Sequence, residues 1–359
     1  MLGRAALEMT PEALGYIVSH EAGTAASVIA TAASAMMDLV HRPSDLRTVV
    51  DVELAATTAI SLAEYAQFPD SPSLSAEVQR YHAIADLGRV ANLMDNPLRW
   101  RSSKDRIRVR QIAVESAIPL IRLLVETGDW GDVWAVAQRT RRAVKRLAGS
   151  DSQATDLLSA TRLFSNMTYA ELAVEATCAA AYAAKKRRLD KKVALRLISE
   201  AWDLAKCCPP QAWPRMVIDI AAEAAIPCVE MPPKQIDDGL RWVQISQQRF
   251  RSYDSADREL LLAMHYETEA RVYHFGELLS LARSSIVSAE SARRRISHGS
   301  IKLGTIHKVR ILETEGRLQL VDGARRDGLK NLERARRLAL GAGIRPKVAA
   351  IERDLSLWS

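Results

Sequence analysis

Apolar residues recur at spacings of three and four through most of the chain, which is the pattern of amphipathic helices. In the first part of the chain, this pattern predicts helices over Asp45–Gln67, Ser75–Met94, Arg106–Thr127 and Asp132–Leu147. Only the short turn Gly128–Gly131 separates the last two. We therefore expect these two helices to be antiparallel neighbours.

A helix start is predicted at Thr10-Pro11-Glu12, where a capping hydroxyl precedes Pro at the first helical position and an acid. Another helix is expected over Gly23–His41. Its stretch Ala22–Met37 carries no charge. That stretch is too short to span a bilayer and is rich in Ala, Ser and Thr, so we interpret it as a closely packed helix. The first residues lack the pattern of a signal peptide.

Helical patterns continue to the end of the chain, and strand-like alternation is missing throughout. The predicted breaks lie at Cys207–Pro214, Pro227–Lys234, Arg251–Ala256, His298–Ser300 and Asp322–Asp327. This succession predicts an all-α protein, an α-solenoid or bundle of antiparallel helix pairs. We expect an N-terminal helical region over 1–150, helical repeats over 151–345 and a capping helix over 346–359. The boundary is placed at Ala148–Gln153.

An internal repeat supports the solenoid prediction. The segment Glu267–Arg271 (ETEAR) recurs as Glu313–Arg317 (ETEGR), 46 residues later. In the helix that follows each segment, a small residue is followed by a large one at +4 and a small one at +7. After the two segments, these residues are Ala282/Ile286/Ala289 and Gly328/Leu332/Ala335. The pattern extends backwards to Gly239/Val243/Ser246 and Ala194/Ile198/Ala201, which gives four occurrences. These positions share one helical face, so each unit is expected to pack closely on the next.

This pattern resembles the tetratricopeptide (TPR) family over roughly residues 171–342. The matching positions are Ala270, Tyr273, Ala282, Ile286 and Ala289, and then Gly316, Gly323, Gly328, Leu332 and Ala335. Gln319 replaces the second Tyr. The period of about 45 exceeds the 34 residues of a TPR, and the leading Trp and terminal Pro are missing. The resemblance implies helix pairs whose first helices line a concave groove.

By spacing within the resemblance, a peptide or protein partner would meet the first helices in that groove. The candidate groove residues are Glu267, Arg271, His274, Arg310, Glu313 and Arg317, with Met264, Phe275, Leu320 and Val321 beside them. Arg271 and Arg317 are predicted to clamp a carboxylate by bidentate hydrogen bonds. An alternative interpretation is that Glu267–Arg271 and Glu313–Arg317 are ordinary i,i+4 ion pairs on a solvated face.

Composition adds a second functional hypothesis. The net charge is +7, and Arg provides 38 of the 50 basic residues, which suits either an anionic partner or an Arg-rich composition without functional meaning. Basic runs occur at Lys185–Lys192 and Arg293–Arg295. A third run supplies possible phosphate contacts at Arg99, Arg101, Arg106, Arg108 and Arg110, with Trp100 as a stacking surface. A nucleic-acid-associated regulator is therefore the alternative function.

Enzyme motifs are missing: the chain has no P-loop, no G-x-S-x-G and no Rossmann glycine pattern. His265, Glu269 and His274 lack the spacing of a metal site. Four cysteines without C-x-x-C spacing fit a reducing cytoplasm. We therefore expect a cytoplasmic binding scaffold or regulator with neither cofactor nor metal, and no membrane association.

Overall fold

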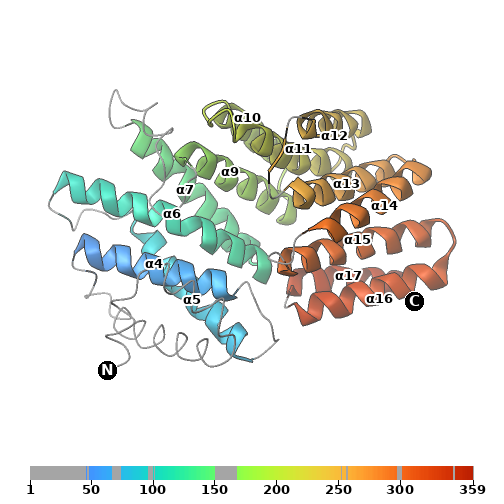
Figure 1. Ribbon diagram of the computed structural model, residues 1–359, viewed down its shortest axis with the longest axis horizontal. Helices are drawn as coiled ribbons and strands as arrows, with labels where there is room; N and C mark the ends of the chain where they lie inside the picture. The colour runs from blue at the N-terminus through green and yellow to red at the C-terminus, as the bar shows by residue number, and fades with distance from the viewer. Residues whose placement is uncertain are drawn as a thin grey trace.

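The computed structural model describes residues 46, 48–66, 74–95, 100, 102–149, 168–251, 253–255, 258–296, 301–342 and 344–358. All regular elements in these ranges are helices (Figure 1). They are α4 (Val49–Ala66), α5 (Leu74–Asn92), α6 (Ser103–Thr127), α7 (Trp130–Gly149), α9 (Tyr169–Lys186), α10 (Lys191–Ala205), α11 (Trp213–Glu230), α12 (Ile236–Phe250), α13 (Arg258–Phe275), α14 (Leu279–Arg295), α15 (Ile301–Val321), α16 (Arg325–Gly341) and α17 (Arg345–Trp358). The all-α prediction is confirmed for this part of the chain. None of these helices is both long and apolar enough to cross a bilayer.

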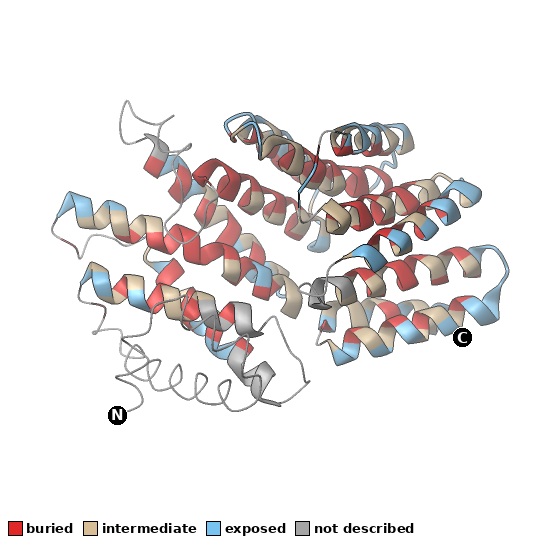
Figure 2. Ribbon diagram, in the orientation of Figure 1, coloured by how far each residue is buried: buried red, intermediate tan, exposed pale blue. Residues whose placement is uncertain are grey.

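Adjacent helices pack as pairs: α4 with α5, α6 with α7, α9 with α10, α11 with α12, α13 with α14, and α15 with α16. The first helices of the pairs (α4, α6, α9, α11, α13 and α15) also contact one another in series. Each second helix packs on its own partner and on the next first helix. Figure 2 shows buried residues running along α6, α9, α11 and α13, so the apolar core follows the first helices.

Local sequence signals set several helix ends. The Ser102 side chain accepts a hydrogen bond from the Asp105 backbone N–H and so caps the start of α6. Gly128 ends this helix in a left-handed conformation (φ 81°), which glycine adopts without strain. At α9, Thr168 and Glu171 form a reciprocal capping box. The predicted turn between α6 and α7 is therefore present where expected.

One predicted break is present but begins later than expected. Pro227 lies inside α11, which continues to Glu230, so the chain leaves the helix later than the sequence suggested. The proline lies in the last turn, where its missing N–H interrupts a single hydrogen bond, and the Met231 N–H still bonds to the Pro227 carbonyl. The expected helices over 10–41, the break at 298–300 and most of the boundary at 148–153 lie outside the described residues.

The small-large-small pattern lies on the buried face of every second helix that carries it. All twelve residues are buried: Ala194, Ile198 and Ala201 in α10, Gly239, Val243 and Ser246 in α12, Ala282, Ile286 and Ala289 in α14, and Gly328, Leu332 and Ala335 in α16. A Cβ on Gly328 would lie 2.9 Å from the Gly316 carbonyl oxygen, and a Cβ on Gly316 would lie 2.9 Å from Leu332 Cγ. The backbones of α15 and α16 therefore cross with no space for a methyl group.

Enlarging a small position of this pattern should destabilise the protein. We expect Ala289→Leu to overpack the contact between α13 and α14 and to lower the free energy of unfolding by about 1–3 kcal/mol. Ala289 is fully buried. Ala349→Leu, at an exposed position of α17, is the matched control. Urea denaturation of both variants measures the difference. Equal stability of the two variants would contradict the close-contact role of Ala289.

The C-terminal helix α17 packs on α16 and also contacts α6. A Cβ on Gly128, directly after α6, would overlap the ring of Pro346 in α17. The Arg345 guanidinium lies 3.4 Å from the Tyr81 hydroxyl of α5. The last helix therefore meets the first helix pairs of the described chain.

Candidate functional site

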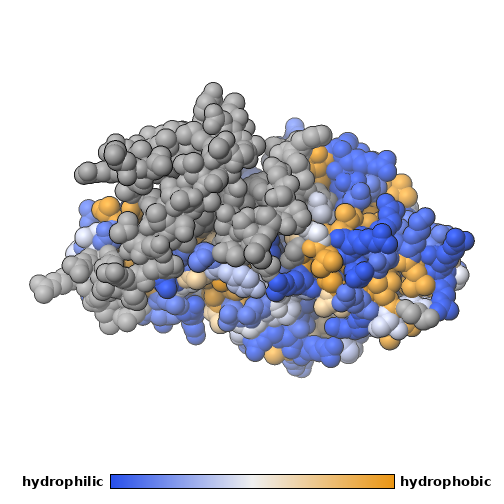
Figure 3. All heavy atoms as spheres, turned by 90° about the horizontal axis from the view of Figure 1, so that it is seen from below, coloured by the Kyte–Doolittle hydropathy of each residue, from blue (hydrophilic) through white to orange (hydrophobic). Residues whose placement is uncertain are grey.

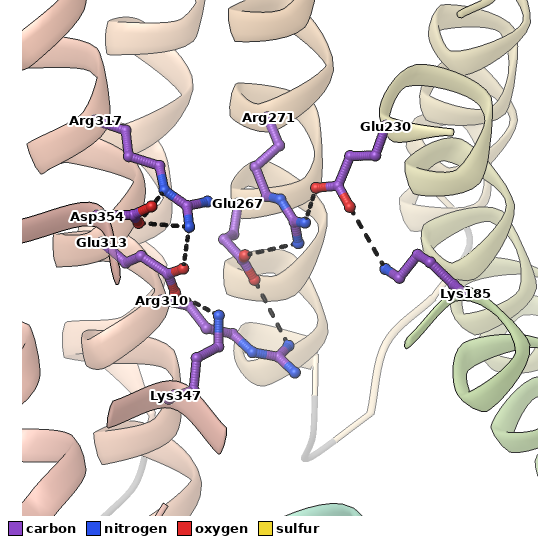
Figure 4. A network of polar contacts seen from close by, with 9 residues as sticks. All are labelled: Lys185, Glu230, Glu267, Arg271, Arg310, Glu313, Arg317, Lys347 and Asp354. Carbon is purple, nitrogen blue, oxygen red and sulfur yellow. Dashed lines mark hydrogen bonds and ion pairs between the residues drawn. The ribbon is translucent and has the colours of Figure 1, made fainter. Parts of the chain in front are cut away.

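A continuous set of ion pairs links the first helices from α9 to α15 (Figure 4). Glu230, at the end of α11, accepts a hydrogen bond from Arg271 of α13 and lies 3.9 Å from Lys185 Nζ of α9. Arg271 Nη1 also lies 3.6 Å from Glu267 Oε1, one helical turn away. The other oxygen of Glu267 lies 3.6 Å from Arg310 Nη1 of α15. Alternating charges thus join four helices.

A second set of ion pairs extends from α15 to α17. The Glu313 carboxylate pairs with Lys347 and lies 2.8 Å from Arg317 Nη2. Arg317 also binds Asp354 of α17, with 2.7 Å between Nη2 and Oδ2 and 2.8 Å between Nε and Oδ2. We call the nine residues drawn in Figure 4 the charge network. It consists of Lys185, Glu230, Glu267, Arg271, Arg310, Glu313, Arg317, Lys347 and Asp354.

The glutamates of the charge network are ionised at neutral pH. Burial raises the pKa of Glu230, but the positive charges of Arg271 and Lys185 outweigh this effect and lower its pKa to about 2. The same holds for Glu313: burial raises its pKa, but the positive charges of Lys347 and Arg317 outweigh burial and lower the pKa to about 2. Burial lowers the pKa of Lys185 to about 7 although Glu230 lies beside it. The side chains of Glu267 and Glu313 are only 4% and 5% exposed.

Five of the six groove candidates belong to this network, and the sixth lies near it. The structure brings together Glu267, Arg271, Arg310, Glu313 and Arg317 (Figure 4). His274 stacks edge-on against Phe275, and burial, followed by the charges of Arg317 and Arg271, lowers its pKa. The i,i+4 pairs named in the sequence exist, but each arginine also holds a carboxylate of another helix. Arg271 and Arg317 therefore link neighbouring helices in addition to forming local pairs.

Sequence reasoning missed the remaining partners. Glu230, Lys347 and Asp354 were not singled out, and Lys185 was noted only as part of a basic run. The 45 residues between Lys185 and Glu230 equal one repeat period, which is a signal that could have linked them. Glu230 lies inside the predicted break at Pro227–Lys234, so the sequence did not place it on a helix facing Lys185.

The surroundings of Trp100, in the basic run Arg99–Arg110, differ from the expectation. Trp100 is only 5% exposed and packs with Leu46, Val52 and Val109, so the predicted stacking surface is wrong. An indole ring is stabilised by leaving water, and the apolar cluster near the start of α6 accommodates it.

The arginines of this run occupy different surroundings. Arg108 Nη2 binds Glu53 Oε1 of α4 at 2.6 Å. Arg106 and Arg110 lie on α6 as well, and burial and then Arg146 lower the pKa of Arg110. Arg99 and Arg101 lie outside the described residues. Their proposed role as phosphate contacts remains a prediction.

No group of three or more potential metal ligands occurs in the described ranges. His265 is buried, and its Nδ1 lies 3.0 Å from the Ser246 hydroxyl. Glu269 accepts a hydrogen bond from Ser285 at 2.6 Å. The four cysteines are unpaired thiols, of which Cys207 alone is exposed. His265 and Glu269 therefore serve packing between α13 and its neighbours α12 and α14.

Two buried histidines should make the protein sensitive to mild acid. Burial lowers the pKa of His265 and of His307 to about 4, with the charge of Arg310 adding to the effect at His307. An unfolded chain binds these protons near pH 6.5, so stability is lost as the pH falls from 6.5 towards 4. Between pH 7 and pH 5 we expect each histidine to remove on the order of 2 kcal/mol of unfolding free energy.

Urea denaturation at both pH values tests this expectation. The variants His265→Gln and His307→Gln should each reduce the difference between pH 7 and pH 5. His82→Gln, at an exposed position of α5, should leave it unchanged. The carboxylates of Glu230 and Glu313 titrate below this window, so they do not obscure the result.

No protein-family model matches the chain, and no characterised protein is significantly similar to it in sequence.

Proposed function

We propose that this protein is a TPR-like α-solenoid that binds a peptide or protein segment along its first helices. The contact pattern supports this architecture. First helices contact one another in series, whereas second helices pack chiefly on first helices. Elements that are closer together on one side give a stack that curves towards that side. The first helices would then form the concave surface, on which repeat proteins of this kind bind ligands.

The charge network indicates the chemistry of the ligand, and it is the observation that carries the proposal. It lies on the first helices α9, α11, α13 and α15 and on α17, and Arg271, Arg310 and Arg317 keep 22%, 29% and 34% of their side chains exposed. With the neighbouring Lys186 and Glu223 included, there are six basic side chains (Lys185, Lys186, Arg271, Arg310, Arg317 and Lys347) and five acidic ones (Glu223, Glu230, Glu267, Glu313 and Asp354). Because the Lys185 pKa is about 7, these charges are nearly balanced. An acidic group of a ligand would therefore bind at the cations that have the fewest carboxylate partners.

Lys186 and Arg310 are the best-placed cations for such a group. Arg271 and Arg317 each already hold two carboxylates. By contrast, Lys186 has no ion-pair partner among the described residues and lies over the Tyr182 ring at 5.3 Å. Among the described residues, the ion pair of Arg310 is the 3.6 Å contact with Glu267 alone. Burial, followed by the charge of Arg271, lowers the pKa of Lys186, and Arg310 adds to this effect. An anion between these cations would relieve their repulsion.

The prediction that follows is a loss of peptide affinity when these cations are removed. A peptide selected from a displayed random library against the full-length chain provides the probe. We expect Lys186→Ala and Arg310→Ala each to weaken its binding about tenfold or more, because a charge-assisted contact on the order of 2 kcal/mol is lost. Calorimetric titration of the wild type, both single variants and the double variant measures the effect.

The matched control is the double variant Arg326→Ala/Arg353→Ala, which removes two exposed arginines of α16 and α17. It should bind like the wild type. The proposal is wrong if the Lys186 and Arg310 variants also bind like the wild type. If Arg106→Ala or Arg108→Ala then abolishes binding, the basic run of α6 is the functional surface.

A nucleic-acid-associated role has less support. The aromatic ring expected to stack on bases, that of Trp100, is buried, and Arg108 is engaged by Glu53. On the face shown in Figure 3, hydrophilic residues with intervening hydrophobic patches cover the visible part of the C-terminal helices. A surface of this mixed kind is typical of protein partners rather than of a phosphate backbone, which needs contiguous positive charge.

A further inference from the structure

A groove with a volume of about 830 Å³ lies between the second helices α7 and α10. Both helices pack on α9. None of the nine residues of the charge network lines this groove. Its volume lies within the range of sites that hold small ligands or peptide side chains. We call it the α7–α10 groove.

Apolar side chains line part of the α7–α10 groove. The groove is lined by Trp134 of α7, by Leu189 just before α10, and by Val193 and Leu197 of α10. Leu197 is buried, whereas the other three remain partly exposed. When the apolar side chains of a ligand displace water from such partly exposed residues, the burial of apolar surface stabilises the complex.

Positive charge surrounds this apolar surface. Arg142 and Arg196 line the groove, are exposed, and have no ion-pair partner among the described residues. The acids that also line it are engaged: Glu200 pairs with Arg141, and the Asp190 side chain accepts a hydrogen bond from the backbone N–H in the first turn of α10. The two unpaired arginines therefore define the charge that a ligand meets.

The same groove borders the basic run Lys185–Lys192, which the charge network uses only at Lys185. The Arg187 guanidinium lies 5.7 Å from the centre of the Trp134 ring. Arg187, Arg188 and Lys192 are exposed. The run thus adds cations at the end of the groove where the chain passes from α9 to α10.

We propose that the α7–α10 groove binds an acidic peptide segment of a partner protein, with hydrophobic side chains on Trp134 and Val193 and carboxylates at Arg142 and Arg196. The combination of an apolar surface with unpaired arginines carries this choice of ligand. Nucleic acid fits less well, because the partly exposed side chains of Leu189 and Val193 suit the hydrophobic side chains of a peptide rather than phosphates. This binding surface is separate from the one on the first helices.

An array of immobilised synthetic peptides tests the proposal, with acidic, basic and hydrophobic content varied independently. The wild-type chain should be retained by peptides that combine acidic with hydrophobic residues. Arg142→Glu/Arg196→Glu should lower this retention at least tenfold, and Val193→Ser should lower it as well. The matched control Arg326→Glu/Arg353→Glu makes the same change of charge on exposed arginines elsewhere and should retain binding. Thermal melting checks that each variant is folded.

Several outcomes would overturn the proposal. One is retention that does not depend on acidic content; another is retention that is unaffected in Arg142→Glu/Arg196→Glu. A third is complete competition by single-stranded oligothymidylate, which would assign the groove to nucleic acid. The variant Lys186→Ala/Arg310→Ala separates this site from the proposed function: groove binding should survive in it. Its loss there would show that the peptides bind to the first helices instead.

Discussion

Replacing Lys191 with Met should destabilise the protein by about 3 kcal/mol, because a buried ammonium group would be lost from a site built around it. Lys191 is only 6% exposed. Its Nζ donates hydrogen bonds to the Cys228 carbonyl at 3.2 Å, to the Pro233 carbonyl at 2.6 Å and to Gln235 Oε1 at 2.8 Å. The side chain thereby fastens the start of α10 to the turn between α11 and α12. Urea denaturation at neutral pH measures the loss.

The neighbouring residue provides a matched control. Lys192→Met makes the same chemical change one position later, where the side chain is exposed. Its effect should stay within about 0.5 kcal/mol, as is usual for surface substitutions. Met keeps most of the aliphatic volume of Lys, so the difference between the two variants isolates the ammonium group. Equal stability of the two variants would show that the three acceptors find water instead.

These two lysines illustrate how far the sequence predicts the structure. The helix face with the small-large-small pattern is buried in all four second helices, because helical periodicity is a local property that a short stretch displays by itself. In the basic run Lys185–Lys192, by contrast, the structure buries Lys191 and leaves only 9% of the Lys185 side chain exposed, whereas Lys192 is exposed. Their carboxylate and carbonyl partners lie about 40 residues away, where no local pattern reveals them.

The charge network follows the same rule. Glu267 and Arg271 share one helical face, so their i,i+4 pair was expected from spacing. Glu230 and Arg310 complete the arrangement only because α11 and α15 both lie against α13. Trp100 is a case in which local sequence misled the prediction. Its neighbours in the sequence are arginines, so it was expected at the surface, but residues of α4 and α6 surround it. Tertiary packing overrides local character in both cases.

Arg271→Ala is expected to lower the free energy of unfolding by about 2–4 kcal/mol, the largest effect predicted within the charge network. The guanidinium joins Glu230 and Glu267. Without it, Glu230 keeps only Lys185 at 3.9 Å, and Glu267, which is 4% exposed, keeps only Arg310 at 3.6 Å. A carboxylate away from water that loses its main partner is costly, whereas the intact pair adds little net stability.

That asymmetry makes the prediction testable by a double-mutant cycle. Glu230→Gln removes one of the two unpaired charges, so Arg271→Ala/Glu230→Gln should be more stable than Arg271→Ala alone. The pH dependence should agree. In the wild type, the lowered pKa of Glu230 contributes stability above pH 4.5 that is lost as the pH falls towards 2. Arg271→Ala raises this pKa and reduces that contribution.

Arg283→Ala serves as the control for an ordinary ion pair. Arg283 of α14 pairs with Asp322, and both side chains are well exposed. Solvent screens such a pair, so its removal should cost less than about 1 kcal/mol. If Arg271→Ala costs no more than Arg283→Ala, the charge network is solvated and does not hold the first helices together. A clear excess for Arg271→Ala would mean that its carboxylate partners depend on this arginine, which is why peptide-binding tests of the first helices should use Lys186 and Arg310 instead.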